Sequence, residues 1–302
     1  ALTSKPVGGL AYFSDNILTA EQITQMVANS QSYSEIPLMI CVDEEGGRVS
    51  RLSGVGLTNY YDPMATYGAS GNAEEVRRIG QELGQALSSA GFNLDFAPVA
   101  DVVTEPLNTE IGDRSFSSDP ETAAKMVAEM VRGLQENGTV SCLKHFPGYG
   151  ENTDTHKGMA HDSRELYEFY NRDFVPFSAG INAVQDKTPA VMVGHTIYDN
   201  IDPDYPASLS PAIHEVLRDK LEFDGVAITD DMGMDAIKEY AGNGSVYVKA
   251  ILADNDMICV TDYETAYNDL KAAYESGELS DDIIDSHVRR ILMMKLGYGI
   301  IK

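Results

Sequence analysis

The chain has 302 residues, of which 43% are hydrophobic, and this size suits one large α/β barrel or two small domains. Its formal net charge of −25 disfavours binding to nucleic acid and to anionic membrane surfaces, because both are themselves negatively charged. No apolar run approaches the ~18 residues that a transmembrane helix needs, so no membrane span is expected.

Three cysteines, Cys41, Cys142 and Cys259, lie inside apolar runs. An odd number of cysteines in such positions predicts buried free thiols rather than disulfides. Free thiols do not determine the compartment, and the chain begins with Ala1 rather than methionine. A cytoplasmic location and an exported one both stay open, the second if an N-terminal segment was removed.

Short apolar runs spread along the chain are predicted to be strands. Each run is continuous rather than alternating, which is typical of parallel strands that are buried on both faces. The runs occupy residues 8–13, 38–42, 94–98, 140–145, 190–195, 226–229 and 257–260.

Amphipathic stretches between these runs predict helices. Asp119-Pro120 and Ser210-Pro211 supply N-cap chemistry for two of them, and Gly297 is the expected C-cap of the last. Strands that alternate with helices indicate either a (β/α) barrel or a doubly wound sheet. The predicted helices occupy residues 74–89, 120–136, 164–184, 211–221, 263–275 and 281–296.

Polar residues at the strand ends favour the barrel, whose catalytic face collects side chains from many strands. A doubly wound sheet would instead place its ligand groups at one switch point, usually with a glycine-rich loop, and no GxGxxG motif follows a strand here. We therefore predict that residues 1–302 form a single (β/α)8-type TIM barrel. Seven strands are recognisable, so we expect the first strand to be missing, altered or supplied from elsewhere. The strand-end residues are Asp43, Asp101, Lys144, His145, His195, Asp230 and Thr261.

A carboxylate and an imidazole follow the fourth predicted strand in a Pro- and Gly-rich loop. In extended backbone, Asp154 and His156 project to the same side, because side chains alternate with a period of two. A neighbouring carboxylate fixes the tautomer of an imidazole and raises its basicity, which suits proton transfer. A metal site formed by Asp154, His156 and His161 is the weaker reading, because it lacks helical spacing or a cysteine partner. No metal and no cofactor are predicted.

Asp230 ends another buried strand, and we identify it as a catalytic carboxylate. Its neighbour Asp231 is expected to cap the next helix or to support the site. Lys144 ends a buried strand and requires polar partners, either sugar hydroxyls or a carboxylate such as Asp95 or Asp101.

Asp43 and Arg51 carry groups that bind sugar hydroxyls well, and Arg114 lies in a long loop from which it could reach the site. His195 completes the candidate binding residues, because it too follows a strand. The alternative for this region is a surface network of salt bridges among Glu44, Glu45, Arg48 and Arg51.

Five segments together resemble the family-3 glycoside hydrolases, and specifically their single-domain β-N-acetylglucosaminidase branch. The similarity extends from about residue 7 to the C-terminus. Two departures are Tyr149, where the family often has histidine, and the extra strand and helix with which members commonly begin. The matching segments are residues 42–49, 112–116, 144–148, 154–156 and 229–232.

The resemblance implies a metal-free barrel that cleaves glycosides by double displacement with retention of the β configuration. It implies that Asp230 is the nucleophile and that His156 is the acid/base, oriented by Asp154. It also implies a small carbohydrate substrate with terminal N-acetylglucosamine, from the cell wall or from chitin. The positions similar to the family's sugar-binding residues are Asp43, Arg51, Arg114, Lys144 and His145.

Other functions stay open at this point. A phosphorylase would use phosphate instead of water in the second step, and a histidine acid/base permits this because it repels phosphate less than a glutamate would. A broader β-glycosidase, a sugar-binding barrel without catalysis and a metal hydrolase are further alternatives. The oligomeric state also stays open.

Overall fold

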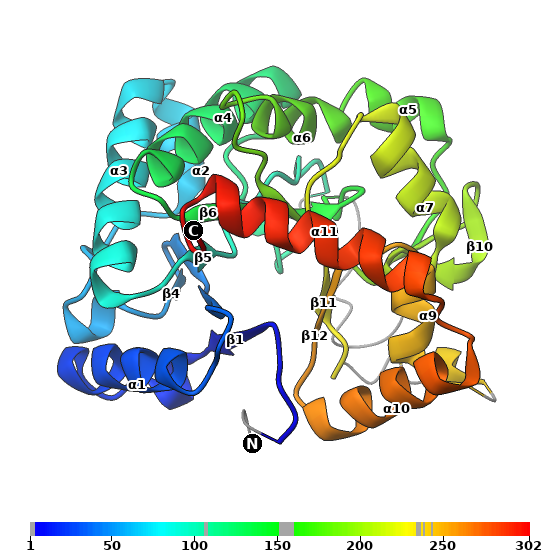
Figure 1. Cartoon of the computed structure of the whole chain (residues 1–302). Coiled ribbons are helices and arrows are strands. Elements are labelled where there is room, and N and C mark those ends of the chain that lie inside the picture. Colours follow the sequence, from blue (N-terminus) through cyan, green and yellow to red (C-terminus); the bar gives the residue numbers. More distant parts are fainter. Residues whose placement is uncertain (1–3, 106–107, 151–159, 234–236, 238, 243) are drawn as a thin grey trace.

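The computed structural model describes residues 4–105, 108–150, 160–233, 237, 239–242 and 244–302. Its main feature is a parallel sheet in the order β1-β2-β5-β6-β8-β11-β12, curved into a nearly closed barrel (Figure 1). The seven predicted strands and the barrel are thus confirmed. The strands are β1 (Gly9–Tyr12), β2 (Met39–Val42), β5 (Leu94–Asp95), β6 (Val140–Phe146), β8 (Ala190–Val193), β11 (Ala227–Asp231) and β12 (Met257–Cys259).

Alternating side chains of each strand fill two different cores. In β2, Met39 and Cys41 belong to the core inside the barrel, whereas Ile40 and Val42 pack with the helices outside. β8 divides in the same way, with Met192 inside the barrel. Because both faces are buried, most positions of the strands before their carboxyl ends are apolar, which explains why the strands were recognisable as continuous apolar runs.

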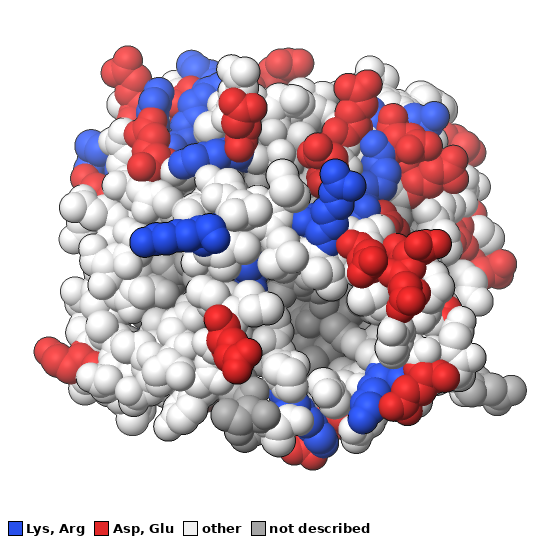
Figure 2. Space-filling view, viewed as in Figure 1, with Lys and Arg blue, Asp and Glu red and all other residues white. Residues whose placement is uncertain are grey.

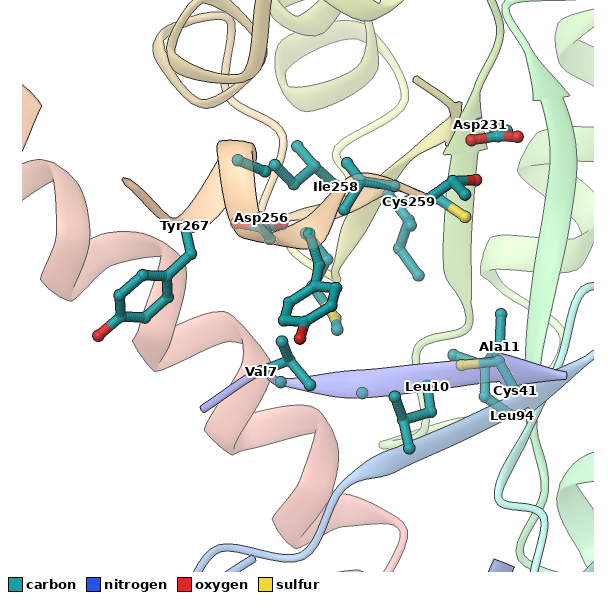
Figure 3. A pocket seen from close by; sticks show the side chains of 18 of the residues that line it. Val7, Leu10, Ala11, Cys41, Leu94, Asp231, Asp256, Ile258, Cys259 and Tyr267 are labelled. Atoms are coloured by element: carbon teal, nitrogen blue, oxygen red, sulfur yellow. The ribbon is translucent and has the colours of Figure 1, made fainter. Parts of the chain in front are cut away.

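The barrel is open between β1 and β12, which do not pair with each other in the described part of the chain. A cavity of about 640 Å³ lies at this seam. Figure 3 shows Leu10 and Ala11 of β1 on one side of it, and Ile258 and Cys259 of β12 on the other. The described residues thus form an open barrel of seven strands, which is one of the outcomes expected when the first strand is missing or altered.

Long helices cover the outside of the barrel. Figure 1 shows α3 (Ala73–Ala90), α4 (Pro120–Glu136) and α6 (Phe174–Ile181) side by side. Gly133 lets α4 approach α3 closely, since a Cβ there would lie 2.4 Å from the carbonyl oxygen of Arg77. The other α-helices are α1 (Ala20–Ser32), α2 (Met64–Ser70), α5 (Leu166–Tyr170), α7 (Pro211–Glu215), α9 (Val246–Leu252), α10 (Tyr263–Ser276) and α11 (Asp281–Gly297).

Short strands and short helices lie outside the seven-stranded sheet. A π-helix, η6 (Val216–Lys220), continues α7, and the short strands form two small sheets. These strands are β3 (Glu44–Gly46), β4 (Val49–Ser50), β7 (His161–Asp162), β9 (Ile197–Tyr198) and β10 (Asp202–Pro206). The 3-10 helices are η1 (Ser14–Asn16), η2 (Ser53–Val55), η3 (Gly112–Arg114), η5 (Ala207–Leu209) and η7 (Glu239–Ala241).

Two of the predicted helix boundaries are wrong. The helix expected over residues 164–184 is two helices, α5 and α6, and the buried Asp173 between them pairs with Arg164 and Arg172. The last helix includes Gly297, and its C-cap is Tyr298. Helical geometry at Gly297 is tolerated, and the left-handed residue is Gly299, with φ of 70°.

The surface charges and the state of the cysteines can be compared with what the composition predicted. Acidic and basic side chains are interspersed on the face shown in Figure 2. All three cysteines are free, as predicted. Within the described residues, no helix is both long enough and apolar enough to cross a bilayer.

A buried ion cluster closes the N-terminal end of the barrel, opposite the strand ends predicted to carry the site. Asp256 accepts from Arg290 Nε (2.6 Å) and His287 (2.8 Å) through one oxygen, and from Arg218 (3.0 Å) and Ala227 N (2.8 Å) through the other. Its side chain is fully buried. The cluster joins β11, β12, η6 and α11, so its role is stability.

Replacing Asp256 with alanine is expected to lower the free energy of unfolding by about 3 kcal/mol. Arg218 and Arg290, which are largely buried, would keep only Asp254 as a carboxylate partner among the described residues, and the buried N–H of Ala227 would lose its acceptor. Urea denaturation would measure the loss. The surface N-cap variant Asp262→Ala is the control, and it should lose clearly less, since within the described part of the chain Asp262 accepts only from the first turn of α10. Equal losses in the two variants would contradict the role of the cluster.

Candidate active site

The candidate residues of the described strands lie at one end of the barrel. Asp43 follows β2, His195 follows β8, and Asp230 lies within β11, one residue before its end. Lys144 and His145 lie within β6 rather than after it, since this strand continues to Phe146. Because all these strands belong to one parallel sheet, their carboxyl ends meet at the same face.

Lys144 is the centre of a buried charge cluster. Its Nζ lies 2.7 Å from Asp43 Oδ1 and 2.5 Å from Glu45 Oε1. Arg114 forms two parallel bonds with Glu45, both 2.8 Å long. The side chains of Lys144 and Glu45 are only 3% and 2% exposed, so these ion pairs are shielded from water.

The cluster controls the charge of Glu45. Burial alone would raise the pKa of this carboxyl, but Lys144 and Arg114 lower it to about 2. Asp43 and Glu45 likewise raise the pKa of Lys144 against the opposing effect of burial. Glu45, Lys144 and Arg114 are therefore charged at neutral pH.

The partners of Lys144 differ from the prediction, which named Asp95 or Asp101. The alternative of a surface network that includes Glu44 and Glu45 is wrong, because both side chains are buried. Glu44 accepts from the backbone N–H groups of Arg51 (2.8 Å) and Leu52 (2.9 Å) and holds the turn that carries Arg51. Arg51 in turn lies 3.8 Å from Asp43.

His145 is fixed by Asp101. One oxygen of this carboxylate accepts from the backbone N–H of His145 (3.1 Å) and lies 2.8 Å from its Nδ1, while the other accepts from the backbone N–H of Tyr149 (2.7 Å). Nδ1 therefore carries the proton that Asp101 accepts. Asp101 therefore supports the site by holding the backbone and the imidazole of His145 in place.

Asp230 lies near two histidines, His145 and His195, and their interactions affect its carboxyl. Burial raises the pKa of its carboxyl, but His145, His195 and a hydrogen bond from the backbone of Asp231 (2.8 Å) together hold it below its usual value. Asp230 is therefore an ionised carboxylate that stays partly exposed, and a nucleophile must be both ionised and accessible.

His195 supports the end of β11. Burial lowers its pKa, so the imidazole is neutral; Nε2 donates to the carbonyl of Asp231 (3.1 Å) and Nδ1 accepts from Ser208 (2.7 Å). Contact between His195 and a sugar stays a prediction, and both of its ring nitrogens already have partners within the protein. Asp231 accepts from the backbone N–H of Gly233 (2.9 Å).

Asp154 and His156 lie outside the described residues, so their predicted pairing is not tested. The described chain stops at Gly150 and resumes at Ala160. His161 belongs to β7, is half exposed and pairs with Asp199 at 2.8 Å. Among the residues that the structure describes, no three His, Cys, Asp or Glu side chains are grouped so that they could hold a metal ion.

Comparison with known proteins decides the family. Residues 1–294 match the glycosyl hydrolase family 3 N terminal domain. The chain belongs to glycosyl hydrolase family 3. The resemblance drawn from the five segments is thus confirmed, and the enzyme is a glycoside hydrolase.

Relatives within family 3 cover most of the chain. A beta-hexosaminidase of Stenotrophomonas maltophilia is 38% identical over 248 residues, covering 78% of this chain and 70% of that protein. A beta-hexosaminidase of Mycobacterium tuberculosis is 34% identical over 308 residues, covering 97% and 77% respectively.

Solved family-3 structures share the barrel. A glycoside hydrolase family 3 beta-N-acetylglucosaminidase from Paenibacillus sp. superposes with a TM-score of 0.93 and 34% identity over 99% of this chain. The chain spans 58% of the length of that enzyme.

Sequence reasoning missed Glu45 as a member of the site. The available signal was its place two residues after Asp43 in a strand-end segment that also carries Arg48 and Arg51. The charges alone suggested a surface network, and only the buried position of Lys144 indicates that a carboxylate must lie nearby.

Proposed function

We propose that this family-3 enzyme is a retaining β-N-acetylglucosaminidase that removes terminal N-acetylglucosamine from cell-wall or chitin-type oligosaccharides. Residues 1–302 would act as one catalytic barrel. The observation that carries the proposal is Asp230, a partly buried carboxylate kept ionised beside His145 and His195 at the catalytic end of the barrel. The names of the beta-hexosaminidase relatives support the choice of sugar.

In the proposed first step, Asp230 attacks the anomeric carbon while His156 donates a proton to the departing oxygen. The glycosidic bond breaks and a glycosyl ester of Asp230 forms. In the second step, His156 takes a proton from water, and the water oxygen displaces Asp230. Asp154 would keep His156 protonated at the start by raising its basicity. An ionised Asp230 and a protonated His156 would then coexist.

The charge cluster would hold the sugar. Lys144 has three N–H donors, and its contacts within the described residues, with Asp43 and Glu45, leave one for a sugar hydroxyl. Asp43 would accept from hydroxyls, with Arg51 close to it. Arg114 would act mainly by fixing Glu45, and His145 by presenting Nε2 toward the sugar.

Release of aryl alcohol from aryl β-N-acetylglucosaminide and aryl β-glucoside, each with and without phosphate, tests the proposal. We expect turnover of the acetamido sugar, at a rate that phosphate does not change. Preference for the glucoside would contradict the proposed sugar. A rate that rises with phosphate, with a sugar phosphate as product, would make the enzyme a phosphorylase.

A further inference from the structure

The backbone turn at Pro147–Gly150 leads from β6 into the segment that carries Asp154 and His156, and side chains from other parts of the chain hold it. The hydroxyl of Tyr198 donates to the carbonyl of Gly148 (3.0 Å), and Asn108 Nδ2 donates to the carbonyl of Tyr149 (2.8 Å). Asp101 accepts from the N–H of Tyr149. The three holding side chains are at most 2% exposed.

The turn has little room to move. A Cβ on Gly150 would lie 1.8 Å from the carbonyl oxygen of Val102, and one on Gly148 would lie 2.3 Å from Asp173 Oδ1. The backbone of the turn is thus closely packed against Val102 and Asp173, just before the described chain stops.

The same tyrosine belongs to the strand that receives the chain on its return. In β9, Tyr198 lies opposite Asp162 of β7, and the flanking N–H groups of Ile197 and Asp199 donate to Ala160 and Asp162, both at 2.9 Å. The backbone around Tyr198 therefore holds the chain after residue 159, while its hydroxyl holds the chain before residue 151.

We propose that Tyr198 is a positioning residue for proton transfer to the leaving group. The inference rests on the proposed function, in which His156 is the acid/base. Proton donation requires hydrogen-bond reach of the leaving oxygen, and a displacement of about 1 Å can cost about a hundredfold in rate. Asp230 is held separately, by β11 and His195, so loss of the Tyr198 hydroxyl affects protonation and spares the nucleophile.

The variant Tyr198→Phe tests this with two N-acetylglucosaminides, one with a nitrophenol leaving group and one with an alkyl alcohol. A nitrophenolate departs without much protonation, whereas an alkoxide does not. We expect kcat/KM to fall about tenfold for the alkyl glycoside and to stay within about twofold for the nitrophenyl one. Since kcat/KM covers the steps up to bond cleavage, it isolates the protonation step.

Tyr12→Phe is the matched control. Tyr12 is a buried tyrosine whose hydroxyl bonds Ser30 at 2.8 Å and whose ring packs edge-on against Phe92, much as Tyr198 packs against Phe169. It should leave the ratio of the two kcat/KM values unchanged. Asn108→Ala removes the neighbouring donor to the turn and should change the ratio as Tyr198→Phe does, which keeps the test available if Tyr198→Phe does not fold.

His156→Ala separates the two proposals. If it lowers the alkyl rate selectively while Tyr198→Phe and Asn108→Ala lower both rates equally or not at all, the positioning role is wrong and the acid/base assignment stands. If His156→Ala itself shows no selectivity, the acid/base assignment is wrong, and the inference for Tyr198 falls with it. Selectivity in all three variants, and none in Tyr12→Phe, supports both.

Discussion

Replacing Asp230 with alanine is expected to lower kcat for aryl β-N-acetylglucosaminide by about 10⁴-fold or more, because no carboxylate remains to form the glycosyl ester. The protein should stay folded, since Asp230 accepts only one hydrogen bond among the described residues, from the adjacent backbone of Asp231. Steady-state kinetics and thermal unfolding of the same preparation would measure both effects.

Asp231→Asn is the control for the loss of an adjacent carboxylate. The asparagine oxygen can still accept from the N–H of Gly233, and the carbonyl that binds His195 is unchanged, so activity should fall far less. Incubation of the wild type with a fluorinated sugar that slows the second step should add the mass of the sugar to the peptide that contains Asp230. A label on another carboxylate, or an active Asp230→Ala, would show that the nucleophile is elsewhere.

The strands were predictable because burial on both faces leaves a strong local signal. Met39 and Cys41 face the interior of the barrel, whereas Ile40 and Val42 face the helices, so every position of β2 is apolar. The parallel order then brings the strand ends together without further information. For this reason Asp43, Lys144 and Asp230 could be placed at one face from sequence alone.

The helix breaks were not predictable from local pattern. Residues 164–184 read as one amphipathic helix, but the chain breaks at Asp173, whose carboxylate binds Arg164 at 2.6 Å and Arg172 at 3.0 Å. The amphipathic pattern runs through this turn, so the local pattern does not mark the break. The same holds for the partner of Lys144, which depends on how far apart β2 and β6 lie in space.

Loss of the Glu45 carboxylate is expected to have a large effect on the free energy of unfolding, and this effect tests the charge cluster. At pH 7, Glu45→Gln should lower the free energy of unfolding by about 3 kcal/mol, the value that corresponds to a carboxyl pKa lowered from 4.5 to about 2. The loss arises because Lys144 and Arg114 stay buried with one carboxylate fewer. Activity should fall as well, since Lys144 and Arg114 would no longer be held in place.

The pH dependence of this loss separates an ion pair from simple packing. Because the pKa of Glu45 is lower in the folded state, its contribution is complete above the unfolded value near 4.5 and disappears as the pH falls toward 2. The difference between wild type and Glu45→Gln in urea denaturation should therefore shrink between pH 5 and pH 3. Glu136→Gln removes a carboxylate that pairs with Arg77 near the surface, and it should change stability less. A difference for Glu45→Gln that stays constant over this range would mean that the glutamate acts through its shape, and that Lys144 and Arg114 do not depend on its charge.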